Sequence, residues 1–449
     1  MANPSLSEYL AQSQRGLYQS IFGPDYLSKT GLGAGTSFTV DTATGIFNTT
    51  YGRKVWQALN NQTRFFNAIP RVVWGNTAGW RVRTDRGSGR SRPVTETGAL
   101  PTVDVSNIET ISSLPRIVST TFGASVKSVF TAQLEGGVGD VLALENENAQ
   151  LDHVKEINEE LLAGSNYIVT GGGATSFTAS SAEIASHFKV GDKVAMYDQA
   201  STSHKRQTGS TVTSVSGTTV NVDSGDADFT DQDIAYIFSR AGLTSIDDIV
   251  SVDGSAVGGV TTRTRAYDLT LASRTSGQWN AAASASYNSG TGRALSLNLL
   301  DTAIQKIREN GGEPKLILLG HDQYFNLERL LNSNQRYLGQ EEYQVGVGSE
   351  RTFPGTRTGL VLATYQGIPI IPDADVAKSV SSADAVLGSN VYVLDTDYLE
   401  IAIAQPTQYV ENRDYFAANA LVVRGLLYTM GEMRCKNIWT QAKIADLNS

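Results

Sequence analysis

The feature that most constrains this chain is a long β-hairpin with no core of its own. Between residues 72 and 118 one face carries Trp80, Val82 and Thr84, and the other carries Arg81, Arg83 and Asp85. A return run containing Val103 and Val105 follows, and this period of two predicts paired strands. The connecting residues, 86–100, are rich in Gly, Ser and Arg and far exceed a compact hairpin turn. Because an isolated two-stranded ribbon is marginal in water, we expect this ribbon to need another surface to lie on.

A long amphipathic helix is predicted between Asp140 and Ala163. Asp140 suits the N-cap position, and Gly164 suits the C-terminal stop. The apolar stripe contains Leu144, Leu151, Val154 and Leu161, and the opposite face carries the carboxylates of Glu145, Glu147, Glu156, Glu159 and Glu160. The stretch from Asp140 to Ala163, about 24 residues, would span roughly 36 Å as a helix. We therefore expect a helix that crosses a whole domain with its acidic face in water.

Two further modules follow the helix. Residues 165–240 contain short strands, a Gly-Asp turn in HFKVGDKVAMYD and a hairpin around Ser216 and Gly217, which predicts a small barrel or sandwich. Residues 241–400 have an α/β pattern with a helix through residues 297–307, a buried strand at 316–319 and a helix from His321 to about Asn334. Apolar strands are expected at residues 359–364, 367–371, 390–395 and 398–404, and the C-terminal stretch is mostly extended in character. The predicted fold class is α+β.

Composition excludes several classes of protein. The chain has 449 residues, 40% hydrophobic and 18% charged, which indicates two or three folded modules. Its formal net charge of −9 argues against a dedicated DNA-reading domain. The one cysteine, Cys435, excludes an intramolecular disulfide framework and a multi-cysteine zinc site. There is no membrane-spanning window and no secretion signal at the start of the sequence, so we expect a soluble protein made in the cytoplasm.

Candidate catalytic residues are few. The four histidines, His153, His187, His204 and His321, show no partners at the spacing of a zinc site or a catalytic triad. His321 beside Asp322 is the best catalytic candidate, but a His-Asp pair that opens a helix is more typical of capping. The structural interpretation of this pair is therefore favoured.

Candidate metal and phosphate sites are also weak. Clustered carboxylates suit calcium, but a solvated loop is favoured because the EF-hand spacing is not met by Asp223, Asp226, Asp228, Asp231 and Asp233. Asp395 and Asp397 follow a predicted strand and are more typical of a turn than of a metal site. The glycine clusters at residues 30–36 and 171–173 lack the flanking residues of a phosphate loop and are interpreted as linkers. We expect no metal and no cofactor.

This acidic chain has one cluster of basic residues, and it lies in the hairpin. It consists of Arg81, Arg83, Arg86, Arg90 and Arg92. These side chains could contact a nucleic-acid backbone or pair with an acidic surface on another subunit. The second interpretation is favoured because the glutamate face of the long helix supplies charge of opposite sign.

Three stretches of the sequence look like those of viral coat proteins. They are FFNAIPRVVWGNTAGWRV, GGVGDVLALENENAQLDHVKEINEELLAGS and PKLILLGHDQYFNLERLL. With the order of the modules, they resemble the major capsid protein fold of tailed double-stranded DNA viruses, first described in phage Hong Kong 97, over most of the chain. The resemblance implies an N-terminal arm (1–45), the start of a peripheral domain (46–71), an extended loop (72–118), a peripheral domain with a spine helix (119–164), an inserted β module (165–240), an axial domain (241–400) and a C-terminal return (401–449).

The resemblance implies a structural role in a virion, with no catalysed reaction. Copies of the chain would associate as pentamers and hexamers into an icosahedral shell, assembled in the host cytoplasm, that encloses double-stranded DNA and contacts it non-specifically. Separate scaffold, portal and decoration or turret proteins would be further partners, and no membrane is involved. Some members of the family cross-link subunits through a loop lysine. This sequence has no lysine between Lys54 and Lys127, so we expect no such bond from the loop.

Three alternatives stay open at this point. An encapsulin-like compartment shares the fold and would hold an enzyme in place of DNA. A carbohydrate-binding surface or tail protein would use the β module at residues 165–240. A hydrolase would depend on His321 and Asp322.

Overall fold

The computed structural model describes most of the chain after residue 62. The described residues are 63–75, 79–83, 93–101, 105–106, 108–132, 141–164, 166–198, 203–223, 231–250, 267, 288, 291–332, 340–344, 352–356, 364–380, 386–413 and 421–449. The chain divides into two compact units, Met1–Val55 with Ser125–Val141, and Trp56–Ala124 with Leu142–Ser449. The described part of the first unit contains the helix α5 (Val126–Ala132), and the predicted arm at residues 1–45 lies outside the described residues. None of the described helices is long and apolar enough to cross a membrane.

The predicted ribbon forms from β2 (Gly79–Arg83) and β3 (Ile108–Ser112), which pair antiparallel as a two-stranded sheet. The alternation along β2 is confirmed, because Trp80 and Val82 pack against the core whereas Arg81 and Arg83 are exposed. The predicted return strand is wrong. Val105 precedes β3 and is 81% exposed, and Val103 lies outside the described residues. The register is set instead by Ile111, which pairs with Trp80 and is 1% exposed.

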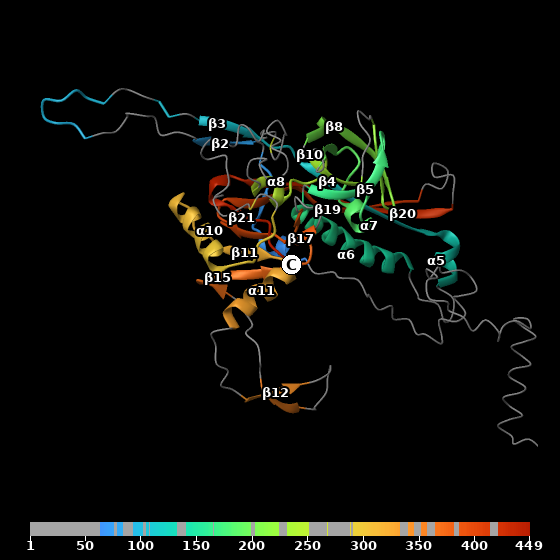
Figure 1. The fold of residues 1–449 in the computed structure, drawn as a ribbon. Coiled ribbons are helices and arrows are strands. Elements are labelled where there is room, and N and C mark those ends of the chain that lie inside the picture. Colours follow the sequence, from blue (N-terminus) through green and yellow to red (C-terminus); the bar gives the residue numbers. More distant parts are fainter. Residues whose placement is uncertain are drawn as a thin grey trace, which may run out of the picture. The chain divides into compact units, whose positions relative to one another are not determined.

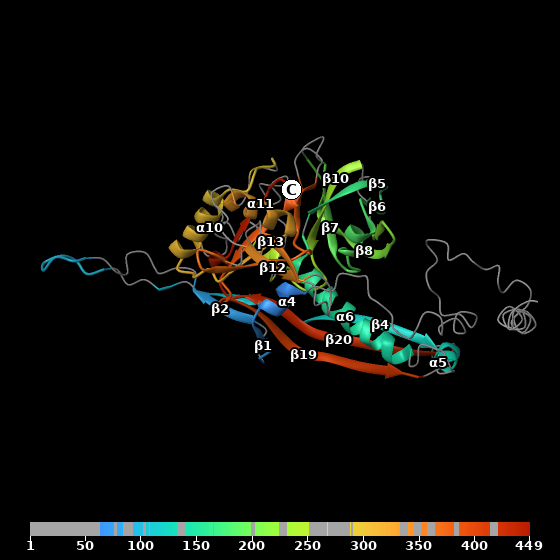
Figure 2. The same ribbon diagram turned by 90° about the horizontal axis from the view of Figure 1, so that it is seen from below.

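A four-stranded sheet carries the long helix. Its strand order is β1-β19-β20-β4, formed by Arg71–Val73, Leu399–Asn412, Val422–Cys435 and Arg116–Ser125. β1 runs parallel to β19, and β19 runs antiparallel to β20. The helix α6 (Val141–Leu162) lies along this sheet, close to the predicted limits (Figure 2). The predicted N-cap, Asp140, lies outside the described residues.

The buried face of α6 differs from the predicted stripe. Leu151 is 39% exposed, whereas His153 is 1% exposed and lies in line with Ala149, Ile157 and Leu161 at steps of four residues. The difference arises because His153 finds two hydrogen-bond partners on the sheet. Its Nδ1 lies 3.0 Å from the Thr120 hydroxyl on β4, and its Nε2 lies 2.7 Å from the Thr429 hydroxyl on β20. A hydrogen-bonded polar side chain can thus occupy a position that hydrophobicity assigns to leucine.

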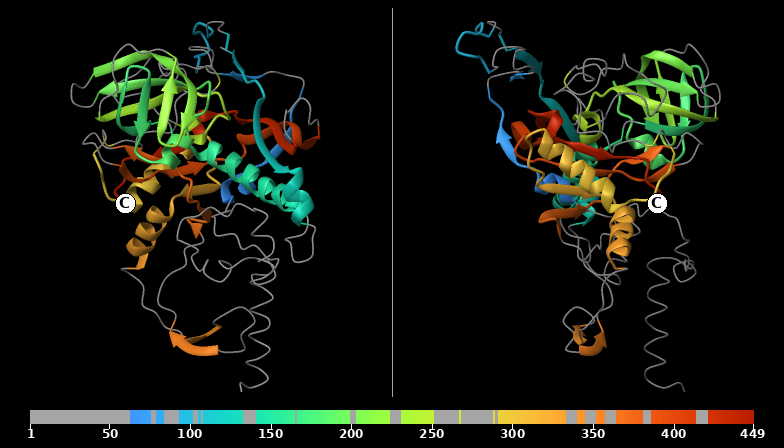
Figure 3. Two further views of the ribbon diagram at one scale, coloured as in Figure 1. Left: turned by 90° about the vertical axis from the view of Figure 1, so that its right-hand side faces the viewer. Right: turned by 60° about the vertical axis from the view of Figure 1, so that its left-hand side comes forward.

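The module predicted for residues 165–240 contains a closed barrel (Figures 1 and 3). Its strand order is β10-β5-β6-β9-β8-β7, formed by Asp231–Ser239, Asn166–Gly173, Ser176–Ala179, Thr219–Val222, Ser203–Ser216 and Lys193–Asp198. The interior is apolar and includes Phe177, Phe188 and Met196, and the short helix α7 (Ala182–Ser186) packs beside β6. The predicted hairpin around Gly217 is confirmed as the β8–β9 turn.

One glycine cluster in the barrel is not a linker, contrary to the prediction. Gly171–Gly173 lies in β5, and Gly172 pairs with Phe177 of β6. A Cβ on Gly172 would lie 2.3 Å from the Ser176 carbonyl oxygen, so only glycine fits this close approach of two strands. The other cluster, at residues 30–36, lies outside the described residues.

The predicted α/β part forms a mixed five-stranded sheet. Its order is β14-β15-β11-β18-β21, formed by Thr364–Tyr365, Ile368–Pro372, Leu316–Leu319, Val391–Leu394 and Ala442–Ile444. One face packs against the helices α10 (Leu297–Glu309) and α11 (His321–Asn332), and the other face joins the core that contains Ile157 and Leu161 of α6. This explains why β11 is buried at every position. The residues predicted as a strand at 359–364 are described only from Thr364 onward.

The remaining described elements are short. They are α4 (Arg64–Ala68), α8 (Ile246–Val250), the 3₁₀ helix η3 (Ile438–Thr440), and two hairpins, β12 (Gln340–Gln344) with β13 (Thr352–Thr356) and β16 (Lys378–Val380) with β17 (Val386–Ser389).

Candidate functional site

The ribbon presents arginines on one face and apolar side chains along its length. Arg81 and Arg83 are exposed on β2, whereas the predicted contact residues Arg86, Arg90 and Arg92 lie outside the described residues. Leu100 and Val105 are each 81% exposed. Further exposed large apolar side chains from the ribbon to the start of β4 are Val94, Ile108, Leu114 and Ile117. Exposed large apolar side chains are typical of an interaction surface where they form one contiguous patch.

The acidic face of α6 divides into two halves. Glu145 and Glu147 lie near the N-terminal end, where Glu147 is exposed and Glu145 is partly exposed. Towards the C-terminal end Glu156 forms an ion pair with Lys189, and Glu159 lies 3.6 Å from Lys155. Glu160 accepts a hydrogen bond of 3.1 Å from the backbone N–H of Leu243. The C-terminal half of this face is therefore only partly in water, contrary to the expectation, because the barrel module and the chain that follows it supply partners for its carboxylates.

Burial raises the pKa of two carboxylates in this half. At Glu159 burial raises the pKa, the negative charge of Asp375 raises it further, and the positive charge of Lys155 lowers it. Burial also raises the pKa of Glu160, and the hydrogen bond from Leu243 opposes it.

A groove of about 420 Å³ opens beside the C-terminal half of the acidic face of α6. Its floor carries Asp152, Glu156 and Glu160, which are spaced four residues apart on the helix. Ile117 of β4 and Val190 of the barrel module line the same groove and are both exposed. Sequence reasoning missed Asp152, although the spacing of three carboxylates at steps of four residues was a readable signal.

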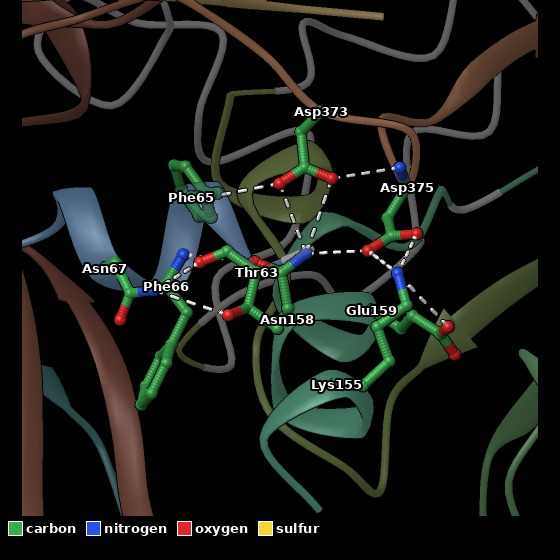
Figure 4. Close-up of polar contacts among 9 residues, drawn as sticks. All are labelled: Thr63, Phe65, Phe66, Asn67, Lys155, Asn158, Glu159, Asp373 and Asp375. Atoms are coloured by element: carbon green, nitrogen blue, oxygen red, sulfur yellow. Dashed lines mark hydrogen bonds and ion pairs between the residues drawn. The ribbon is translucent and has the colours of Figure 1, made fainter. Parts of the chain in front are cut away.

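A buried polar junction joins α4, α6 and the end of β15 (Figure 4). The amide of Asn158 donates to Asp375 at 2.6 Å and to Asp373 at 3.3 Å. Lys155 donates to both carboxylate oxygens of Asp375 at 2.5 Å. Burial raises the pKa of Asp375, and the bonds from Lys155 and Asn158 oppose that effect. Sequence reasoning missed this junction, although Asp373 and Asp375 repeat the spacing of Asp395 and Asp397 after a buried strand.

The catalytic candidate His321 is exposed at the start of α11. Asp322 accepts a hydrogen bond of 2.7 Å from the backbone N–H of Ser389, which ties α11 to β17. Burial alone would raise the pKa of Asp322, but the hydrogen bonds from Ser389 and Gln323 outweigh it and hold the pKa below its usual value. Asp322 therefore has a structural role, as the favoured interpretation predicted, but its hydrogen bond from Ser389 joins α11 to β17 in place of the predicted cap.

The other candidates also have structural partners. Asp395 accepts from the backbone N–H groups of Glu313 and Asp397, and Asp397 pairs with Lys315 at 2.6 Å. Asp223 accepts from the backbone N–H of Thr211, whereas Asp226 and Asp228 lie outside the described residues. The side chains of the described residues contain no group of three His, Cys, Asp or Glu placed to hold a metal ion.

The architecture and the sequence together define the class of protein. A two-stranded ribbon, a long helix on a four-stranded sheet and a five-stranded α/β sheet form a mixed α+β fold, as predicted. The chain belongs to the SU10 major capsid protein family, whose sequence profile matches residues 32–447. It is therefore a capsid shell protein.

One solved structure agrees with this assignment at the level of the fold. A chain of the Cyanophage A-1(L) capsid asymmetric unit matches with a TM-score of 0.51 and 14% identity, over 94% of this chain and 99% of that one. The capsid of a native GTA particle matches with a TM-score of 0.44 and 10% identity, over 94% and 99% of the two chains. The holo-SrpI encapsulin complex from Synechococcus elongatus PCC 7942 matches with a TM-score of 0.41 and 10% identity, over 92% and 97%. No curated protein matches the chain.

Proposed function

We propose that copies of this chain associate as pentamers and hexamers and close into an icosahedral shell around double-stranded DNA, without catalysing a reaction. The observation that carries this proposal is the exposed apolar surface of the ribbon, including Leu100 and Val105. A ribbon of two strands has no core of its own in which such side chains could be buried. They stay in contact with water unless another surface covers them. A second copy of the chain covers them, and contacts that are not self-complementary close into rings.

The charged groups of the chain provide the polar part of the same contact. The ribbon arginines, among them Arg81 and Arg83, meet acidic groups on the neighbouring copy: Glu145 and Glu147 at the start of α6, and Asp152 in the groove. The groove suits a basic and apolar segment because Ile117 and Val190 flank its carboxylates. Glu156, Glu159 and Glu160 contribute less, since their partners lie within the chain.

Further partners follow from the same proposal. Separate scaffold, portal and decoration or turret proteins complete the particle, which assembles in the host cytoplasm without a membrane. The net charge of −9 suits a wall that binds packaged DNA only weakly and non-specifically.

Electron microscopy of the purified protein tests the proposal. We expect closed icosahedral particles with nuclease-protected double-stranded DNA inside. Particles that hold an enzyme in place of DNA would support the encapsulin alternative. A chain that stays monomeric at high concentration, with its ribbon protected from hydrogen exchange, would contradict shell formation.

Charge reversal tests the polar contact. Asp152→Arg should reduce the yield of particles, because an arginine in the groove repels the ribbon of the next copy. Glu309→Arg makes the same charge change at an exposed position on α10 and should leave the yield unchanged. Equal yields from the two variants would count against the groove as the contact surface.

A further inference from the structure

Besides its chain connections to β1 and β4, the ribbon contacts the rest of its unit through side chains. In the described part of the chain, β2 pairs only with β3, and neither strand belongs to the four-stranded sheet. The joint consists of buried apolar groups, chiefly Ile111 and the partly buried Trp80. A joint of this kind can change its angle without breaking a hydrogen-bonded strand ladder.

Tyr267 lies between the ribbon and the end of β20. Its ring meets the Trp80 ring edge to face, with centroids 5.0 Å apart and an interplanar angle of 80°. Its hydroxyl donates to the Met433 carbonyl oxygen at 2.8 Å and accepts from the Cys435 backbone N–H at 2.8 Å. One side chain therefore contacts the base of the ribbon and satisfies two backbone groups of β20.

The backbone of Tyr267 shows how firmly it is held. Its φ of 60° lies in the left-handed region, which residues other than glycine seldom adopt. Such a conformation persists where the surrounding contacts over-determine it. Tyr267 is 7% exposed and belongs to the same hydrophobic core as Ile111, Met433 and Cys435.

We infer that Tyr267 is a positioning residue that sets the angle at which the ribbon leaves its unit, and thereby which part of a neighbouring copy the ribbon meets. The inference rests on the proposed shell function. About 24 residues separate β2 from β3, so each half of the connection reaches at most roughly 40 Å, and a rotation of about 10° at the base would move its far end by up to about 7 Å. A small change at Tyr267 is thus amplified at the contact between copies.

Tyr267→Phe tests this inference because it keeps the ring and removes only the hydroxyl. The matched control is Tyr392→Phe, since the Tyr392 hydroxyl, on β18, donates to Asp247 at 2.9 Å in the same core. Both variants should lower the thermal unfolding temperature by similar amounts. Only Tyr267→Phe should speed hydrogen exchange in residues 79–83 and 108–112, by roughly tenfold for the loss of buried hydrogen bonds.

Particle size provides the second readout. Tyr267→Phe should shift or broaden the distribution of particle diameters in electron micrographs, whereas Tyr392→Phe should give the wild-type distribution. Unchanged diameters and ribbon exchange in Tyr267→Phe, or equal changes in the control, would overturn the inference. If Tyr267→Phe does not fold, Trp80→Phe provides the test, since it alters the ring contact and leaves the β20 hydrogen bonds in place. Altered particle diameters in Trp80→Phe would support the inference, and wild-type diameters would overturn it. A wild-type protein that forms no shells would contradict the proposed function itself.

Discussion

The carboxylate of Asp373 accepts a hydrogen bond of 3.2 Å from the backbone N–H of Phe65, although 308 positions of sequence separate the two residues. The N-cap residue of α4, Thr63, makes no side-chain capping bond. Asn158 of α6 accepts from the next N–H, that of Phe66, at 3.0 Å. The first turn of α4 is therefore capped by two distant elements, which attach the segment preceding the ribbon to the long helix.

We predict that Asp373→Ala destabilises the protein by about 1–3 kcal/mol, because it leaves buried N–H groups without an acceptor. Urea unfolding of the unassembled protein measures the change. Asp397→Ala is the matched control, since it removes an exposed aspartate whose ion pair with Lys315 is open to solvent. Equal effects of the two substitutions would show that the junction contributes no more than a surface ion pair.

Two adjacent glycines of the barrel should respond differently to alanine. In Gly172→Ala the new Cβ would lie 2.6 Å from the Phe177 Cα and closer still to the Ser176 carbonyl, so a strand must move. We expect a loss of about 1–3 kcal/mol or more in the free energy of unfolding. A Cβ on Gly173 would meet no atom within 4 Å beyond its two chain neighbours, so Gly173→Ala should be near neutral. Limited proteolysis of residues 165–240 would locate the effect, and comparable sensitivity of both variants would contradict the predicted clash.

His153 should make the stability fall in mild acid. Burial lowers its pKa from 6.5, and the nearby Glu156 opposes this effect. The unfolded chain then binds its proton at a higher pH than the folded chain, so stability is complete above pH 6.5 and decreases as the pH falls below it. Burial also lowers the pKa of His187, to about 4, so the wild type contains both contributions. Comparing urea unfolding of wild type and His153→Gln from about pH 7.5 to about pH 4.5 isolates His153, and parallel pH profiles would refute the assignment.

Glu432 should act in the opposite direction. Burial raises its pKa to about 7, and the ion pair with Arg116 at 3.0 Å opposes that shift. The folded state therefore holds this proton more tightly than the unfolded state, so the contribution to stability is complete below pH 4.5 and is lost as the pH rises through 7. The lost contribution is on the order of 3 kcal/mol. Glu432→Gln should flatten the stability profile between about pH 5 and about pH 8, and a slope equal to that of wild type would count against this role.

The local sequence pattern predicted the elements whose conformation depends on residues close together in the sequence. The α6 helix, the alternation of Trp80 and Val82 with Arg81 and Arg83, the buried β11 strand and the turn at Gly217 all follow from periodicity or turn chemistry within a few residues. The same reasoning failed where burial depends on a distant partner. His153 is buried because Thr120 and Thr429 lie opposite it, and the return strand is set by the burial of Ile111.

The amino-acid pattern by itself determined the kinds of element, their order along the chain and the resemblance to a coat protein. Only the tertiary structure decided that strands β5 to β10 close into a barrel, that Asp373 caps a helix 308 positions away, and that Tyr267 bonds to the end of β20. The physical reason is range. Helix and strand periods arise between neighbours in sequence, whereas the pairing of distant polar groups depends on which surfaces exclude water together, and that is settled only when the whole chain packs.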